Sequence, residues 1–269
     1  MKRQRKAWFL VIASLIIGYV ALLCWRAVPF DSSQVAAGIE RIKLPFGQIV
    51  FYAKWSPDGE RIAFISQIPG EIEGVYGLYF YQLQDEKLTQ VPLPAKRFSP
   101  FNEFYLHQLD WAPDGTKIAI GGKPWRVQDV EGIWLVDPDN NEMEYLTKGN
   151  RAAWSSSGER LAIVESTVYS ATIKILEIKD HEEQRVGEVE QSGFTEDMDI
   201  DWSPTEDALI TSVPGVNAEG YRWNILYLLK LDGSFFGPIL EDSPWRLDKP
   251  VWLPDGKWLA FTAFGQEKG

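Results

Sequence analysis

A short motif that recurs five times along the chain decides the kind of fold to expect. Each copy has a Trp, a turn segment such as Ser-Pro-Asp-Gly and an apolar run, and the copies align without gaps. The five copies span residues 54–66, 110–122, 153–165, 201–213 and 251–263. The Trp residues of the shared column are Trp55, Trp111, Trp154, Trp202 and Trp252, at spacings of 43 to 56 residues. Self-similarity at such a period predicts a repeat architecture.

Each copy is predicted to be a β-hairpin. Pro presets the backbone for a turn, Asp can accept a hydrogen bond from the backbone two residues on, and Gly takes the positive φ that other residues resist. The Asp of the turn, such as Asp58, could also be a metal ligand. However, Ser157 and Thr205 replace it in two copies, so we interpret this position as turn chemistry.

Further strands follow the first four hairpins. These β-branched and aromatic runs are 77–83 and 87–93, 132–137 and 144–149, 172–178 and 184–189, and 224–233 and 237–240. Each unit is therefore a four-stranded sheet, and stacking such sheets around an axis buries both of their faces. We predict an all-β fold, a β-propeller of about five blades. The repeat Trp and the Ile or Leu seven residues later should form the core between blades.

The five copies resemble the WD-like propeller repeat of the TolB family, which also occurs in the propellers of prolyl-oligopeptidase-type peptidases. The resemblance covers about residues 40–263 and is carried by turn and core residues. It implies a propeller and, as a class, protein–protein contacts at the cell envelope. The Ser-Asp-His residues of the peptidases belong to a separate hydrolase domain, so they have no counterparts in this sequence.

The ring needs a strand from the N-terminal side to close. The fifth copy ends shortly before Gly269, whereas the stretch 39–47 precedes Trp55 with the spacing of an outer strand. We expect this stretch to complete the blade that the C-terminal end begins, which closes a ring of five. The alternative is a six-bladed pattern that is cut short.

The N-terminal part differs in kind from the repeats. Residues 1–6 are basic, and residues 7–25 contain no charge, which gives a helix of about 28 Å, close to the thickness of a bilayer core. We predict a cytoplasmic tip and transmembrane signal anchor over 1–26, a linker over 27–38 and a propeller over 39–269. The basic flank favours a propeller outside the cytoplasm, periplasmic or at the cell surface. A signal cleaved after Ala37 and lipidation at Cys24 are the alternatives.

Charge narrows the class of partner. The chain carries −11 overall, and without the five cations at residues 2, 3, 5, 6 and 26 the rest carries −16. Such an acidic exterior argues against a nucleic acid partner.

The propeller axis is one candidate for a functional site. The strands that end at each Trp carry polar residues that should converge there, among them His107, Asp110, Asp199 and Asp201. A bound ligand or cation near the three Asp residues is one interpretation, and ion pairs around a wet channel are the other. The stretch 196–201 resembles a calcium loop in composition, but it lacks the central Gly and the terminal Glu. We therefore assign no metal and no cofactor.

The longest connection between blades, 92–108, is the second candidate site. It carries Phe98, Phe101, Phe104 and Tyr105, which could form a recognition patch or pack beneath the loop.

The sequence favours an interaction module that binds another protein or a peptide and has no catalytic residue. It contains no nucleophile elbow, paired-His metal motif, phosphate loop or Cys-x-x-Cys. A sensor that binds a small ligand or sugar in the channel, and a hydrolase or lyase that uses axial carboxylates, remain alternatives.

Overall fold

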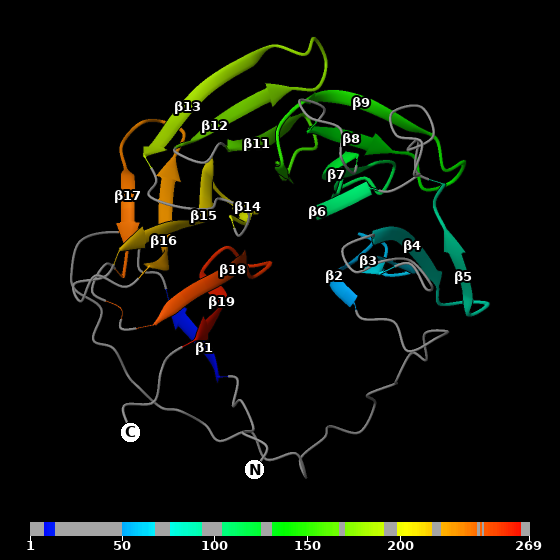
Figure 1. The fold of residues 1–269 in the computed structure, drawn as a ribbon, viewed down its shortest axis with the longest axis horizontal. Coiled ribbons are helices and arrows are strands. Elements are labelled where there is room, and N and C mark those ends of the chain that lie inside the picture. The colour runs from blue at the N-terminus through cyan, green and yellow to red at the C-terminus, as the bar shows by residue number, and fades with distance from the viewer. Residues whose placement is uncertain are drawn as a thin grey trace.

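The described part of the chain is built from β-strands arranged around a central axis (Figure 1). The computed structural model describes residues 8–13, 50–67, 76–92, 104–124, 131–166, 170–190, 198–216, 222–240, 243 and 245–264. These residues contain no helix, which confirms the predicted all-β class.

Four of the sheets are four-stranded antiparallel blades with strands in chain order from the axis outward. Blade 1 comprises β2 (Val50–Trp55), β3 (Arg61–Gln67), β4 (Tyr76–Gln82) and β5 (Lys87–Gln90). Blade 2 comprises β6 (Phe104–Trp111), β7 (Ile118–Pro124), β8 (Gly132–Val136) and β9 (Met143–Lys148). Blade 3 comprises β10 (Arg151–Trp154), β11 (Arg160–Ser166), β12 (Ser170–Glu177) and β13 (Glu183–Glu190). Blade 4 comprises β14 (Ile200–Trp202), β15 (Ala208–Val216), β16 (Arg222–Lys230) and β17 (Phe236–Ile239). The predicted strand pairs after each hairpin are thus confirmed.

The fifth blade combines the two ends of the chain. It contains β18 (Arg246–Trp252), β19 (Trp258–Phe264) and β1 (Trp8–Ala13), and β1 runs antiparallel to β19. A strand from the N-terminal end therefore joins the C-terminal blade, but it is not the segment that the spacing of the repeats predicted. The strand is formed by residues 8–13, whereas the predicted segment 39–47 lies outside the described residues.

The predicted membrane anchor is not confirmed. Residues 8–13 fall within the stretch 7–25 for which a membrane helix was expected, and in this structure they form a strand instead. Their apolar, partly β-branched and aromatic composition suits a strand as well as a helix. The rest of 7–25 lies outside the described residues, and within the described part of the chain no helix is long and apolar enough to span a bilayer.

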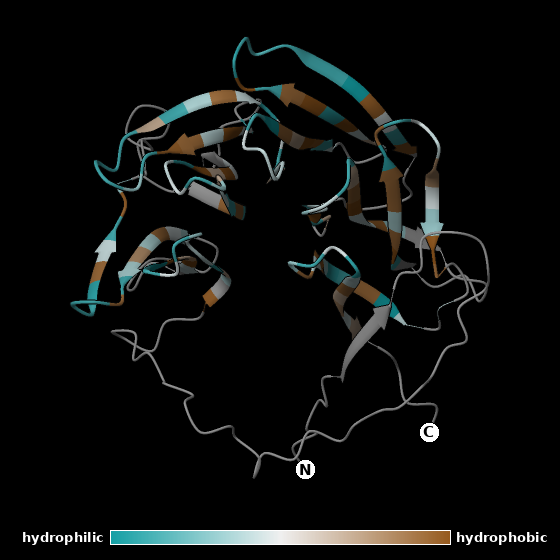
Figure 2. Cartoon of the chain, turned by 180° about the vertical axis from the view of Figure 1, so that it is seen from behind, coloured by the Kyte–Doolittle hydropathy of each residue, from teal (hydrophilic) through white to brown (hydrophobic). Residues whose placement is uncertain are grey.

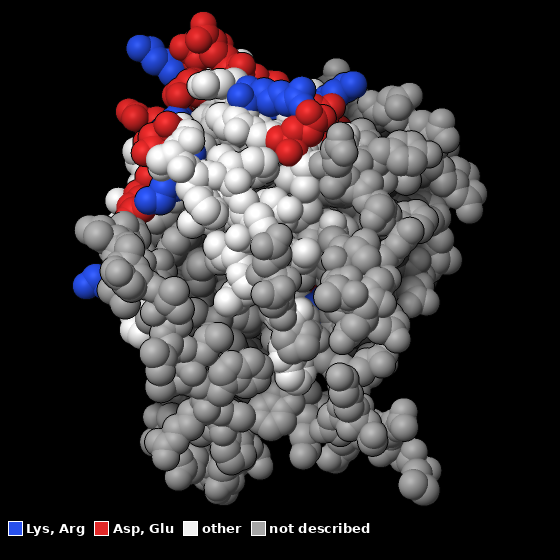
Figure 3. All heavy atoms as spheres, turned by 90° about the vertical axis from the view of Figure 1, so that its left-hand side faces the viewer, with Lys and Arg blue, Asp and Glu red and all other residues white. Residues whose placement is uncertain are grey.

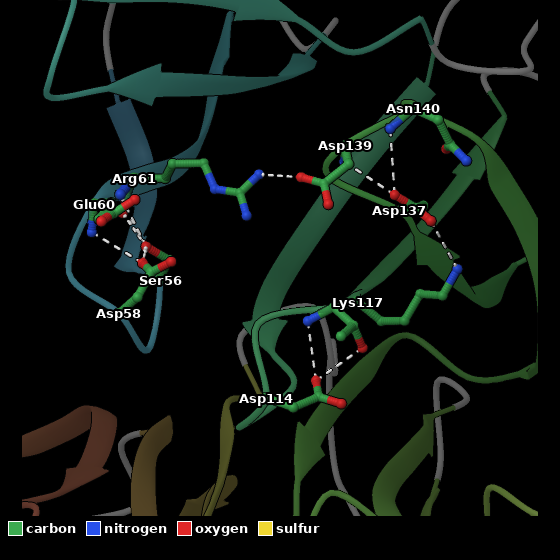
Figure 4. Close-up of polar contacts among 10 residues, drawn as sticks. Ser56, Asp58, Glu60, Arg61, Asp114, Lys117, Asp137, Asp139 and Asn140 are labelled. Carbon is green, nitrogen blue, oxygen red and sulfur yellow. Dashed lines mark hydrogen bonds and ion pairs between the residues drawn. The ribbon is translucent and has the colours of Figure 1, made fainter.

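The repeat turns have the chemistry that the motif predicted (Figure 4). Asp58 Oδ1 accepts hydrogen bonds from Glu60 N at 2.9 Å and from Ser56 Oγ at 2.5 Å. In the third copy Ser157 Oγ accepts from Glu159 N instead. The turn glycines of the first, second, third and fifth copies have φ between 64° and 74°, which other residues rarely adopt. The Asp of the motif is therefore a turn former in these hairpins.

The core lies between neighbouring blades, as the apolar colouring of the inner and middle strands indicates (Figure 2). Trp111, Trp154 and Trp202 are buried there, and so are Ile118, Leu161, Leu209 and Leu259 of the column seven residues later. Trp252 is half-buried.

Blade 1 departs from this rule, and the prediction for its Trp was wrong. The Trp55 side chain is 57% exposed, and Ile62 is half-buried. In blade 2 the equivalent Trp111 packs against blade 1, because its core cluster includes Leu78 and Phe80 of that blade. Trp55 would need a preceding blade to cover it in the same way. The large exposed side chains Val251 and Trp258 of blade 5 show that this end of the ring also presents apolar surface.

The outer edge of the propeller carries charges of both signs. Figure 3 shows Asp, Glu, Lys and Arg side chains gathered at the upper edge of the molecule, where β13 lies in Figure 1. Interspersed charges of this kind are typical of a solvated surface.

Candidate functional site

A column of polar residues lies on or directly before the innermost strands, three positions before each repeat Trp. Its members are Tyr52, Gln108, Arg151, Asp199 and Lys249. The ladder register shifts in β2, β6 and β18 at or just before this position. Such bulges re-aim side chains out of the regular alternation of a strand. In blades 1, 2 and 5 the polar position of the column thus coincides with an irregularity of the inner strand.

These five side chains contact one another or the neighbouring backbone across the axis. Tyr52 Oη donates a hydrogen bond of 2.9 Å to Asp199 Oδ1, and Arg151 Nε lies 3.8 Å from the same oxygen. The Lys249 ammonium lies 4.8 Å from the centre of the Tyr52 ring, within cation–π range. Gln108 Nε2 donates a hydrogen bond of 2.9 Å to the backbone carbonyl of Ile200 in β14. Blades 1, 3, 4 and 5 therefore meet at Tyr52 and Asp199.

A second cluster is formed by residues directly before the repeat Trp. Lys54 Nζ lies 2.6 Å from Asp110 Oδ1 and 3.7 Å from Asp201 Oδ1. The other oxygen of each carboxylate accepts a backbone hydrogen bond from the next blade, Asp110 from Trp154 N at 2.8 Å and Asp201 from Trp252 N at 2.7 Å. Both carboxylates thus join their own blade to the following one, and Lys54 joins them to blade 1.

Burial and charge together set the protonation of this cluster. Burial disfavours the Lys54 ammonium, but the carboxylates of Asp110 and Asp201 more than offset this effect and raise the pKa of Lys54 above its ordinary value. Burial raises the pKa of Asp201 to about 6, with a further rise from Asp110 and an opposing effect of Lys54. Lys54 therefore remains charged at neutral pH, while Asp201 takes up a proton in mildly acidic solution.

We expect Asp201→Asn to remove a pH dependence from the stability of the protein. Because the pKa of Asp201 is raised on folding, the folded state binds this proton more tightly than the unfolded chain does. Stability therefore falls as the pH rises from about 4 through about 6. Between pH 4 and pH 7 the wild type should lose about 2 kcal/mol of unfolding free energy relative to the variant. Urea unfolding at a series of pH values measures this difference.

Asp137→Asn is the matched control, because it should act in the opposite direction. The backbone N–H of Asp139 lowers the pKa of Asp137, so this carboxylate stabilises the fold above its unfolded-state pKa and loses that contribution on acidification. The stability of the Asp137 variant should thus fall furthest below that of the wild type at neutral pH. If the unfolding free energy of Asp201→Asn changed with pH in parallel with that of the wild type, the raised pKa would not belong to Asp201.

The three predicted axial carboxylates lie in two different clusters. Asp110 and Asp201 share Lys54, whereas Asp199 contacts Tyr52 and Arg151. Within these two clusters the cations at positions 54, 151 and 249 balance the three carboxylates when all are ionised. Within the described residues no group of three His, Cys, Asp or Glu side chains could hold a metal ion.

The other predicted site residues lie away from these clusters or outside the described residues. His107 Nε2 lies 3.2 Å from Glu131 Oε1 at the start of β8. Phe104 and Tyr105 belong to β6, and their side chains are not among those described. Phe98 and Phe101 lie outside the described residues, so the recognition patch stays a prediction.

Sequence reasoning missed Tyr52, which joins blade 1 to blades 4 and 5 at the axis. The signal that would have found it is the repeat itself. The position three before each Trp is polar in all five copies, although the strands around it are largely apolar. A polar side chain that recurs at one position of a buried strand predicts a shared environment, here the axis.

The comparison with known proteins concerns the fold. No protein-family profile matches the sequence, and no curated protein matches it either. A TolB structure from Agrobacterium tumefaciens superposes with a TM-score of 0.57 at 20% identity, over 81% of this chain and 71% of that one. The fold is that of a TolB-like β-propeller. An oligogalacturonate lyase in complex with manganese superposes with a TM-score of 0.56 at 13% identity, over 84% of this chain and 68% of that chain. A prolyl endopeptidase superposes with a TM-score of 0.50 at 13% identity, over 77% of this chain and 32% of that one.

Proposed function

We propose that this chain is a propeller that binds another protein or a peptide, without catalysis of its own, at the outer side of a membrane. The N-terminal basic and apolar segments would hold it there, with its N-terminus in the cytoplasm. In that anchored state residues 8–13 would lie in the membrane instead of pairing with β19. The resemblance of the repeats to the TolB family supports a role in envelope protein contacts.

The observation that carries the binding proposal is the exposure of Trp55. The same column is buried in blades 2, 3 and 4, whereas Trp55 is 57% exposed on the first blade. Val50 of the same strand is 40% exposed, and Val251 and Trp258 of blade 5 are also exposed. Exposed Trp is costly in water and is enriched at the centres of protein interfaces. The face of blade 1 therefore has the composition of a docking surface.

Site-specific photo-crosslinking tests this function. The photoreactive residue p-benzoylphenylalanine would replace Trp55 in the full chain, and Phe235, which is an exposed aromatic residue on blade 4, would be replaced in a control. Irradiation of intact cells should give a discrete adduct from position 55 that position 235 does not give. The absence of adducts at position 55, or identical adducts at both positions, would overturn the proposal.

The axial carboxylates provide the second candidate function, a lyase or hydrolase centre. The raised pKa of Asp201 favours it, because a carboxyl group with a pKa of about 6 can exchange protons near neutral pH. Against it, both oxygens of Asp110 and of Asp201 are already engaged by Lys54 and by backbone N–H groups.

Metal addition separates these two candidates. Manganese occurs with the oligogalacturonate lyase of the same fold, so Mn²⁺ and Ca²⁺ are suitable probes. Because the oxygens of Asp110 and Asp201 are already engaged by Lys54 and by backbone N–H groups, we expect millimolar concentrations of either ion to leave the Tm within about 1 °C of its value in EDTA. A rise of several degrees that disappears in Asp110→Asn would favour the lyase centre instead.

A further inference from the structure

Two repeat Trp residues are covered by an arginine that reaches across from the preceding blade. The guanidinium of Arg61 lies 5.6 Å from the centre of the Trp111 ring, and its Nη1 is 2.7 Å from Asp139 of the same blade 2 (Figure 4). The guanidinium of Arg160 lies 5.0 Å from the Trp202 ring, and its Nη2 is 2.5 Å from Asp207 of blade 4.

Both arginines occupy one position of the repeat. Arg61 and Arg160 each come six residues after the Trp of their own blade. A Trp ring and a carboxylate on one blade thus receive a guanidinium from the blade before it. The planar guanidinium pairs with the carboxylate and lies over the Trp ring at the same time. Arg can make both contacts with one group, which Lys does less well.

Blade 1 carries the same two groups, a Trp ring and a carboxylate, that hold the arginine on blade 4. Glu60 comes five residues after Trp55, as Asp207 comes five residues after Trp202. The backbone confirms that the two positions are equivalent. The Glu60 carbonyl accepts a hydrogen bond of 3.0 Å from Leu83 N, and the Asp207 carbonyl accepts one of 2.9 Å from Leu231 N. The Trp and carboxylate that hold Arg160 in blade 4 are therefore both present in blade 1.

Among the described residues, no cation reaches this pair. Trp55 is 57% exposed and Glu60 is exposed, and the Glu60 carboxylate makes no ion pair or hydrogen bond with the described residues. Blade 5 would supply the arginine in a closed ring, but its corresponding residue is Trp258. Trp258 is itself 37% exposed and carries no charge.

We propose that Trp55 and Glu60 form a receptor for an arginine side chain of a partner protein, which docks a basic segment against the open face of blade 1. The partner's guanidinium would lie over the Trp55 ring and pair with the Glu60 carboxylate, as Arg160 does with Trp202 and Asp207. The −11 net charge of the chain favours the approach of a basic segment. This inference rests on the proposed binding function and names the chemistry of its partner.

A pair of matched peptides tests the receptor. The probe is the acetylated peptide amide of residues 59–67 of this chain, which contains Arg61, and its match has citrulline in place of the arginine. Citrulline keeps the shape of arginine without its charge. The readout is the indole N–H signal of Trp55 in the full chain labelled with ¹⁵N-Trp, assigned by comparison with Trp55→Phe. We expect a saturable shift with the arginine peptide and at least roughly tenfold weaker binding of the citrulline peptide.

Three variants distinguish specific binding at this receptor from non-specific binding of the peptide. Glu60→Gln should weaken the binding of the arginine peptide roughly tenfold. Trp55→Ala lacks the reporting indole, so its binding is followed by the fluorescence polarisation of a labelled peptide, and this variant should not bind. Glu159→Gln is the control, because Glu159 occupies the same position in blade 3, where Trp154 is buried. It should bind the peptide like the wild type.

Two results would overturn the inference. One is equal binding of both peptides, or no effect of Glu60→Gln. The other is a Trp55 that resists oxidation by N-bromosuccinimide in the free protein as strongly as Trp111 does, because another part of this chain would then cover it. If position 55 still crosslinks to a partner in cells, the binding function stands and the arginine receptor alone fails.

Discussion

Replacement of Lys54 by Met should destabilise the protein by about 3 kcal/mol at neutral pH. Lys54 lies 2.6 Å from Asp110 and 3.7 Å from Asp201, and the side chains of these carboxylates are 12% and 16% exposed. Met has a similar length and no charge, so the change leaves two carboxylates close together with little solvent to screen them. Removal of one partner of a buried ion pair costs more than the pair contributes, since the remaining charge stays desolvated.

Further variants separate this charge effect from a loss of packing. The triple change Lys54→Met, Asp110→Asn and Asp201→Asn should recover a large part of the lost stability. The Asn side chains can still accept the hydrogen bonds from Trp154 N and Trp252 N, and no unpaired charge remains. Urea unfolding followed by circular dichroism gives the free energies for both variants and the wild type.

Lys117→Met is the matched single change. Lys117 pairs with Asp137 at 3.3 Å, but its side chain is 38% exposed, so this variant should lose less than about 1 kcal/mol. Equal losses in the Lys54 and Lys117 variants would show that the axial cluster is solvated in the same way as the surface.

The blades were predictable because the repeat carries the information locally. The turn of Asp58 and Gly59 and the apolar strands that follow are complete within about twenty residues, so no distant contact is needed to recognise the hairpin. The pairing of the N-terminal strand with blade 5 was not determined by local sequence in the same way. Residues 8–13 have an apolar composition that suits either a membrane helix or a strand, and their pairing with β19 depends on a partner some 250 residues away.

The placement of the axial carboxylates was predictable, but their pairing was not. The sequence places Asp110, Asp199 and Asp201 at the ends of inner strands, and the structure brings them to the axis. Their partners depend on which blades face each other, so the separation into a Lys54 cluster and a Tyr52 cluster required the three-dimensional arrangement. The exposure of Trp55 was missed for the same reason, because a Trp column looks equivalent in every copy until its neighbour is known.

The same substitution at two positions of this column should reduce stability by very different amounts. Trp111→Ala should cost about 4 kcal/mol, because the Trp111 side chain is 5% exposed, packs against blade 1 and lies beneath the Arg61 guanidinium. Its Nε1 also donates a hydrogen bond of 3.2 Å to the Lys54 carbonyl, which would lose its donor. Trp55→Ala removes a side chain that is mostly in water already, so it should cost about 1 kcal/mol or less.

Urea unfolding of the two variants under identical conditions decides whether blade 1 has an open face. The two positions share residue type, repeat column and hairpin turn, so differences in intrinsic strand preference cancel in the comparison. A gap of about 3 kcal/mol between the variants follows if Trp111 is covered by a blade and Trp55 is not. Equal losses would mean that Trp55 is buried in the folded chain in solution. A buried Trp55 would leave no acceptor for an external arginine, so this measurement tests the receptor independently of any peptide.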